Sequence, residues 1–177
     1  MDRTVAGLLV AGLCLAGLTG CASLDDGRVK GWATGDVTID GRHYAVLDVA
    51  LELEPGEEGY YSIHAAPSPD TDVDCVDGLA GGMALYGPIP PSVKRVEDLA
   101  GKRLPVEFSG DGDDANLCFV GTEGLLGARD AWVTIESVDG DRARFRMSGE
   151  FELYDDGEQV STLLASARGT AQIVSAP

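Results

Sequence analysis

Residues 133 to 153 read VTIESVDGDRARFRMSGEFEL, and this stretch decides the fold class. From Phe145 to Leu153 every second residue is apolar or glycine, and the residues between them are polar or charged. Such alternation is typical of a β-strand with one face in a core and the other in solvent. The Asp-Gly pair at 139–140 is a hairpin turn signal, and the strand before it continues the same apolar face through Ala131, Val133 and Ile135.

The same alternation recurs on both sides of this hairpin. From His43 to Leu53 the odd-numbered positions are mostly apolar, so they are predicted to face the core. From Val160 to Val174 one face carries Leu163, Ala165, Ala167, Ala171 and Ile173. We therefore expect a mainly β fold, either an antiparallel β-barrel or a two-sheet β-sandwich of about seven or eight strands.

Register at the turns follows from matching the apolar faces of neighbouring strands. At Asp40-Gly41, a match requires Ile39 opposite His43, which a two-residue loop does not allow. At Asp139-Gly140-Asp141, Ile135 should in the same way lie opposite Phe145. The sequence therefore predicts three-residue loops or adjacent β-bulges at both turns.

One short helix is expected in the middle of the chain. Ser92 is the predicted N-cap, and Gly101 is the predicted stop. Between them Val93, Val96 and Leu99 form one apolar stripe. The helix is expected to close one end of a barrel or to cross between two sheets.

The N-terminal segment contains an export signal. An apolar run from Val5 to Leu18 is shorter than the roughly 20 residues that span a bilayer as a helix, so it is interpreted as a signal region. The next residues, Leu18-Thr19-Gly20-Cys21, resemble the lipobox of bacterial lipoprotein precursors. The expected organisation is a signal peptide over residues 1–20, a tether over 21–30 and a single β domain over 31–177.

The lipobox resemblance implies that Cys21 carries a thioether-linked diacylglycerol and usually a third acyl chain on its amine. Two or more acyl chains give stable membrane anchoring. Ala22 follows Cys21, where an aspartate retains many lipoproteins in the inner membrane. The expected location is the cell envelope, at the outer membrane and facing the periplasm.

The net charge restricts the partners of the mature chain. Because Asp2 and Arg3 are both removed with the signal, the mature chain keeps the full net charge of −17. Such a surface repels nucleic acid and anionic lipid headgroups. The membrane partner is therefore expected to be engaged through the lipid on Cys21.

Two cysteines remain after export and lipidation. Cys14 is lost with the signal and Cys21 is modified, which leaves Cys75 and Cys118 in an oxidising compartment. A disulfide between them is the favoured interpretation. A metal site is the alternative, although the pair lacks the C-x-x-C spacing and a nearby histidine.

Acidic residues surround both of these cysteines. The first cluster consists of Asp70, Asp72, Asp74 and Asp77, and the second consists of Asp111, Asp113, Asp114 and Asn116. A disulfide would bring the two clusters together, and calcium prefers several carboxylate and carbonyl oxygens. Asp70, Asp72, Asp74, Asp111 and Asp113 are therefore candidate calcium ligands. Two solvated polar loops are the simpler interpretation.

No catalytic motif is recognised in the sequence. His43 and His64 are the only histidines, and both are interpreted as core or rim residues with satisfied hydrogen bonds. Trp32, Tyr60, Tyr61, Tyr86 and Trp132 are suited either to recognition or to a core.

On the hairpin strand, Arg142, Arg144 and Arg146 form a basic stripe that cross-strand pairing explains, with Glu136 opposite Arg144.

We expect a non-enzymatic envelope lipoprotein that binds a partner protein, an envelope polymer or a small ligand. A periplasmic enzyme with an unrecognised site and a calcium-stabilised structural module are the alternatives. A cavity lined by apolar residues would favour a small ligand, and a filled interior would favour binding at the surface.

Overall fold

The computed structural model describes residues 24–25, 28–29, 33–55, 59–68, 82–108, 116–119, 125–155 and 158–174. Almost all of them lie in strands, so the expected mainly β fold is confirmed. The elements are β1 (Leu24–Asp25), β2 (Arg28–Val29), β3 (Thr34–Ile39), β4 (Arg42–Glu54), β5 (Tyr60–Pro67), β6 (Gly82–Pro88), the 3₁₀ helix η1 (Val96–Leu99), β7 (Arg103–Val106), β8 (Leu117–Cys118), β9 (Leu125–Asp139), β10 (Arg142–Asp155) and β11 (Glu158–Val174).

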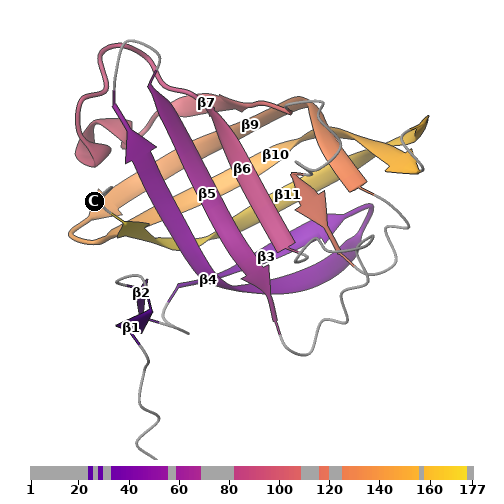
Figure 1. The fold of residues 1–177 in the computed structure, drawn as a ribbon, viewed down its shortest axis with the longest axis horizontal. Helices are drawn as coiled ribbons and strands as arrows, with labels where there is room; N and C mark the ends of the chain where they lie inside the picture. The colour runs from indigo at the N-terminus through magenta and orange to yellow at the C-terminus, as the bar shows by residue number, and fades with distance from the viewer. Residues whose placement is uncertain are drawn as a thin grey trace, which may run out of the picture.

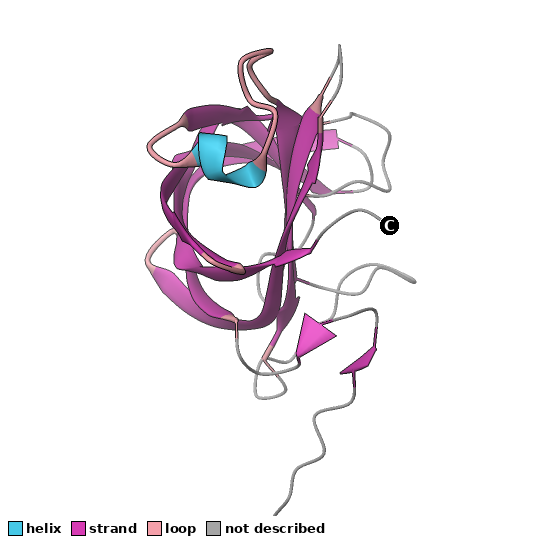
Figure 2. Cartoon of the chain, turned by 90° about the vertical axis from the view of Figure 1, so that its left-hand side faces the viewer, coloured by secondary structure: helices cyan, strands magenta, loops and turns pink. Residues whose placement is uncertain are grey.

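Nine strands form one sheet that closes on itself (Figure 1). Their order is β10-β11-β3-β4-β5-β6-β8-β9-β7, and the additional pairing of β9 with β10 completes the ring. The pairings are antiparallel except for a short parallel one between the end of β11 and β4. Viewed end-on, the sheet forms a ring (Figure 2), and its interior is filled by the buried apolar side chains. The closure is irregular, because β7 and β8 are short strands that pair with β9 over a few residues.

The predicted alternation of β9, β10 and β11 is confirmed. Phe145, Met147 and Phe151 of β10 are buried, as are Val133 and Ile135 of β9. On β11 the predicted face is also the inner one, with three buried alanines and two partly buried larger residues, namely Ala165, Ala167, Ala171, Leu163 and Ile173.

The single face predicted for β4 is wrong over its first half. Tyr44 and Val46 are buried, whereas His43 and Ala45 are exposed. A bulge at Asp48, which has a φ of 52°, inserts one extra residue into the strand. After the bulge Val49 and Leu51 are buried, as predicted, and Ala50 between them is buried as well. A single period of two therefore does not describe β4 across the bulge, where the strand changes the face that it turns to the core.

The predictions for the two hairpin turns differ in outcome. At the first, Ile39 pairs directly with Arg42 around a two-residue loop, so the predicted longer loop is wrong. Asp40 and Gly41 both have positive φ, 47° and 81°, as a tight hairpin turn requires. The bulge at Asp48 later turns the odd-numbered residues of β4 toward the core. A longer loop at this turn is therefore not needed to match the apolar faces.

At the second turn the predicted adjacent bulge is confirmed. Asp139 pairs with Arg142, and the register then shifts so that Ile135 lies opposite Phe145. The extra residue is Glu136, which lies between the pairs on either side of the shift.

The expected helix is present but shorter than predicted, and its N-cap is Arg95, so the prediction of Ser92 is wrong. The Asp98 carboxylate accepts hydrogen bonds from the backbone N–H groups of Lys94 and Arg95, both at 3.0 Å. These bonds lower the pKa of Asp98 and fix the start of the 3₁₀ turn.

The helix ends just before Gly101, as predicted. Gly101 has a φ of 75°, and its N–H donates to the carbonyl of Ile135 at 2.7 Å. Leu99 is buried in the core, so the helix covers one end of the ring (Figure 2).

Candidate functional site

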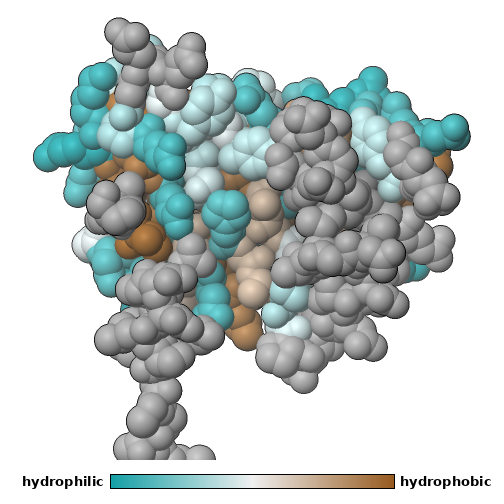
Figure 3. Space-filling model, in the orientation of Figure 1, coloured by the Kyte–Doolittle hydropathy of each residue, from teal (hydrophilic) through white to brown (hydrophobic). Residues whose placement is uncertain are grey.

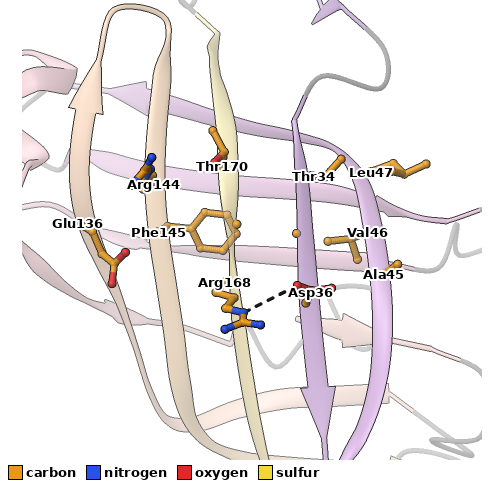
Figure 4. Close-up of a pocket in the computed structure, with 12 residues that line it drawn as sticks. Thr34, Asp36, Ala45, Val46, Leu47, Glu136, Arg144, Phe145, Arg168 and Thr170 are labelled. Atoms are coloured by element: carbon orange, nitrogen blue, oxygen red, sulfur yellow. Dashed lines mark ion pairs between the residues drawn. The ribbon is translucent and has the colours of Figure 1, made fainter.

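An open groove lies on the outer face of the ring, where β9, β10, β11, β3 and β4 lie side by side (Figure 4). Its volume is about 560 Å³. The lining residues are Thr34, Gly35, Asp36, Ala45, Val46, Leu47, Glu136, Arg144, Phe145, Arg168, Gly169 and Thr170.

Two glycines let β3 and β11 approach each other closely at the groove. Gly35 of β3 lies directly opposite Gly169 of β11. A Cβ atom at Gly169 would lie 2.7 Å from the carbonyl oxygen of Thr34, and one at Gly35 would lie 2.9 Å from that of Arg168. Side chains at these two positions would therefore force the strands apart. Sequence reasoning did not identify this pair, because each glycine is an isolated residue in its strand and only the register brings the two together.

Arginines and carboxylates form a row across the outer face. Arg146 and Arg168 lie opposite each other on β10 and β11. Each also has an acidic partner, because Arg146 pairs with Glu136 and Arg168 lies 3.8 Å from Asp36. The predicted position of Glu136 opposite Arg144 is wrong. The bulge at Glu136 places Ser137 opposite Arg144 instead.

Arg144 differs from its neighbours on the basic stripe. It is exposed in the groove, and among the described residues no ion pair joins it to a carboxylate. Three guanidinium groups, those of Arg144, Arg146 and Arg168, face the two carboxylates of Asp36 and Glu136. The groove and its border therefore carry one excess positive charge on a chain whose net charge is −17.

The groove also contains hydroxyl groups. Thr170 is half-buried and lies opposite Arg144, and Thr34 is exposed and lines the groove on β3, on the other side of β11. A guanidinium offers several N–H donors in a planar arrangement that matches a carboxylate, and each hydroxyl can donate one more hydrogen bond. This combination is suited to holding a single anionic group.

Most of the site residues predicted from the sequence lie outside the described residues. These are Cys21, Cys75, Asp70, Asp72, Asp74, Asp111 and Asp113. Cys118 is buried in β8, and its pairing with Cys75 stays a prediction. Within the described ranges, no cluster of three or more His, Cys, Asp or Glu residues could hold a metal ion.

Asn116, which precedes Cys118, has a structural role. It is fully buried, and its side-chain amide donates to the carbonyls of Ala84 and Glu107, both at 3.0 Å. Its Oδ1 accepts from the backbone N–H of Ala128 at 2.7 Å. These bonds tie β6, the end of β7 and β9 together.

The two histidines lie apart on the outer face. His43 is exposed, and its Nδ1 lies 3.0 Å from the Thr38 hydroxyl. His64 is also exposed but lies on β5, opposite Ala50 and Ala84. The expectation that His43 would lie at the rim of the apolar face is not met, because the bulge in β4 turns it outward.

The aromatic side chains are distributed between core and surface. Tyr61 is buried, and its hydroxyl donates to the carbonyl of Pro105 at 2.7 Å. Its burial raises the pKa of the phenol, and Glu107 adds to this effect. Trp132 is half-buried under the Arg103 guanidinium, whereas Tyr60 is exposed. On the described part of the face in Figure 3, apolar surface occurs as small areas bordered by hydrophilic side chains.

No helix in the described ranges is long and apolar enough to span a membrane. Comparison with known proteins gives no match to this chain, whether to a family model, a curated protein or a solved structure.

Proposed function

We propose that this chain is a lipid-anchored cell-envelope protein whose β domain binds a partner, without catalysis, at the groove around Arg144. The observation that carries the proposal is that Arg144 has no ion pair with a carboxylate among the described residues, although it lies in a groove on a strongly acidic protein. Side chains such as Tyr61, Phe119 and Phe145 pack across the interior of the ring, which favours binding at the outer surface.

The charges of the groove select a monoanion. One guanidinium is available, and the carboxylates of Asp36 and Glu136 border the site on either side. Because Asp36 and Glu136 are each paired with an arginine, one positive charge is in excess; a single carboxylate balances it, whereas a dianion such as phosphate would leave a net negative charge. The partner is therefore a protein, polymer or small ligand that presents a carboxylate to Arg144.

The location of the protein at a membrane is part of the same proposal. Lipid on Cys21 anchors it at the outer membrane, facing the periplasm, and the short tether keeps the domain close to the bilayer. A disulfide between Cys75 and Cys118 suits this oxidising compartment. The apolar run from Val5 to Leu18, the lipobox resemblance at Leu18 to Cys21 and the two remaining cysteines support a role in the envelope independently of the groove.

A peptide titration tests binding at the groove. We expect acetyl-Gly-Glu-Gly-amide to shift the NMR signals of the Arg144 side chain and of Thr170, with a Kd on the order of millimolar, as one charge-assisted contact allows. Arg144→Gln should weaken binding about tenfold or more, because the lost hydrogen bonds are to a charged group. Arg142→Gln is the matched control, since Arg142 lies on the same stripe beside Asp141 and outside the groove.

The same peptide with glutamine in place of glutamate tests whether the negative charge matters. If both peptides bind equally, or if Arg144→Gln and Arg142→Gln behave alike, the groove is not a carboxylate site.

A further inference from the structure

Among the strands that the structure describes, the first part of β11 has a neighbour on one side only. β3 pairs with β11 from Ala165 to Gly169. Beyond this pairing, one more hydrogen bond joins the Asp40 N–H to the Leu164 carbonyl at 3.0 Å. Among the described strands, residues 158–163 pair only with β10. The β10 and β11 ends project at the right of Figure 1, beyond the rest of the sheet.

The direction of the backbone groups follows from the strand geometry. Alternate residues of an antiparallel strand direct their N–H and C=O groups to the same side. Because the Leu164 carbonyl points toward β3, the N–H and C=O of Thr162 point to the same, open side. An additional strand could therefore continue the sheet along this edge.

Exposed apolar side chains mark this edge. Val160 is 54% exposed and Leu164 is 68% exposed, and with Tyr60 they are the exposed large hydrophobic residues of the described chain. Edge strands that only face water are usually protected by charged side chains, prolines or β-bulges. The register with β10 leaves Val160 as an extra residue, so the regular part of this edge runs from Ser161 to Leu164. Two large apolar residues beside an open backbone edge indicate a surface that another chain covers.

The surrounding charge indicates which kind of chain this is. Leu164 pairs with Glu150 across the hairpin, Glu158 begins the strand, and Asp40 lies at its junction with β3; all three acidic residues are exposed. A second copy would bring the same carboxylates and another net charge of −17. A cationic segment would instead be attracted.

We propose that the β11 edge from Glu158 to Leu164 binds an extended segment of a partner protein in which apolar and basic residues alternate. The segment adds a strand to the sheet, its backbone bonds to Thr162, and its apolar side chains cover Val160 and Leu164. This surface is separate from the Arg144 groove, which uses residues 168–170 of β11. The two sites therefore take partners of opposite charge.

The experiment uses the mature lipidated protein in detergent micelles, with acetyl-Lys-Val-Lys-Val-Lys-amide as the probe. We expect this peptide to shift the NMR signals of residues 158–164 and to slow hydrogen exchange of the Thr162 amide. The matched peptide with glutamate in place of lysine should bind at least about tenfold more weakly, since it meets like charges. Arg144→Gln should leave binding of the lysine peptide unchanged.

Two variants and a control complete the design. Thr162→Pro removes the N–H on the open side and should weaken binding about tenfold or more. Leu164→Lys should do the same without altering the backbone, which covers the case in which Thr162→Pro fails to fold. Ser148→Lys adds the same charge at an exposed position in the paired middle of β10 and should change the Kd less than twofold.

Equal binding of the lysine and glutamate peptides would overturn the proposal, as would unaltered exchange of the Thr162 amide. Protection of this amide by self-association, in the absence of peptide, would identify a second copy as the occupant and would also overturn it.

Discussion

Asn116→Ala is expected to lower the free energy of unfolding by about 4 kcal/mol. The substitution leaves the carbonyls of Ala84 and Glu107 and the N–H of Ala128 without their partner at a fully buried position. Each unsatisfied buried group costs about 1–3 kcal/mol, and partial relaxation or entry of water reduces the sum. Urea denaturation should show a lower midpoint with an unchanged slope.

Thr38→Ala is the control for this variant. Thr38 also makes a side-chain hydrogen bond, to His43, but at an exposed position, so the expected change is within about 0.5 kcal/mol. A loss of stability for Asn116→Ala as small as that of the control would show that Asn116 does not hold the three strands together.

Cys21→Ser is expected to abolish incorporation of labelled fatty acid into the protein. Serine lacks the thiol that forms the thioether, so the lipid cannot be attached. The signal peptide should then remain uncleaved, and the precursor should migrate more slowly than the mature protein in gel electrophoresis.

Cys14→Ser provides the matched substitution, because Cys14 lies within the apolar run and should not affect labelling. If Cys21→Ser retained the fatty-acid label and normal processing, the anchor would not be on Cys21.

The sequence was sufficient to predict strands in which apolar and polar residues alternate without interruption along the part that faces the core. In β10, apolar and polar residues alternate from Phe145 to Leu153, and the structure buries the predicted face. In β4, the bulge at Asp48 changes the face. Aspartate tolerates a positive φ, but Asp48 also fits the polar face of an uninterrupted strand, so the sequence does not reveal the bulge. A period of two is therefore reliable only between bulges.

The candidate site was only partly predictable, because it depends on register. The basic stripe was evident in the sequence. Glu136 was predicted to pair with Arg144, whereas the bulge places it where it pairs with Arg146. The close approach of β3 and β11 at the groove involves Gly35 and Gly169, which lie near opposite ends of the domain sequence. The open edge of β11 depends on where β3 ends, which a strand pattern alone does not give.

Site-specific photo-crosslinking in the intact envelope tests most directly whether a partner docks at the groove. A benzophenone side chain would replace Thr170, which lines the groove, or Lys94, which is exposed near η1 and outside it. We expect a discrete crosslinked product from position 170 that is absent from position 94 and is lost when Arg144→Gln is added. The absence of any product at position 170, the same product at both positions, or its persistence with Arg144→Gln would contradict the proposed function.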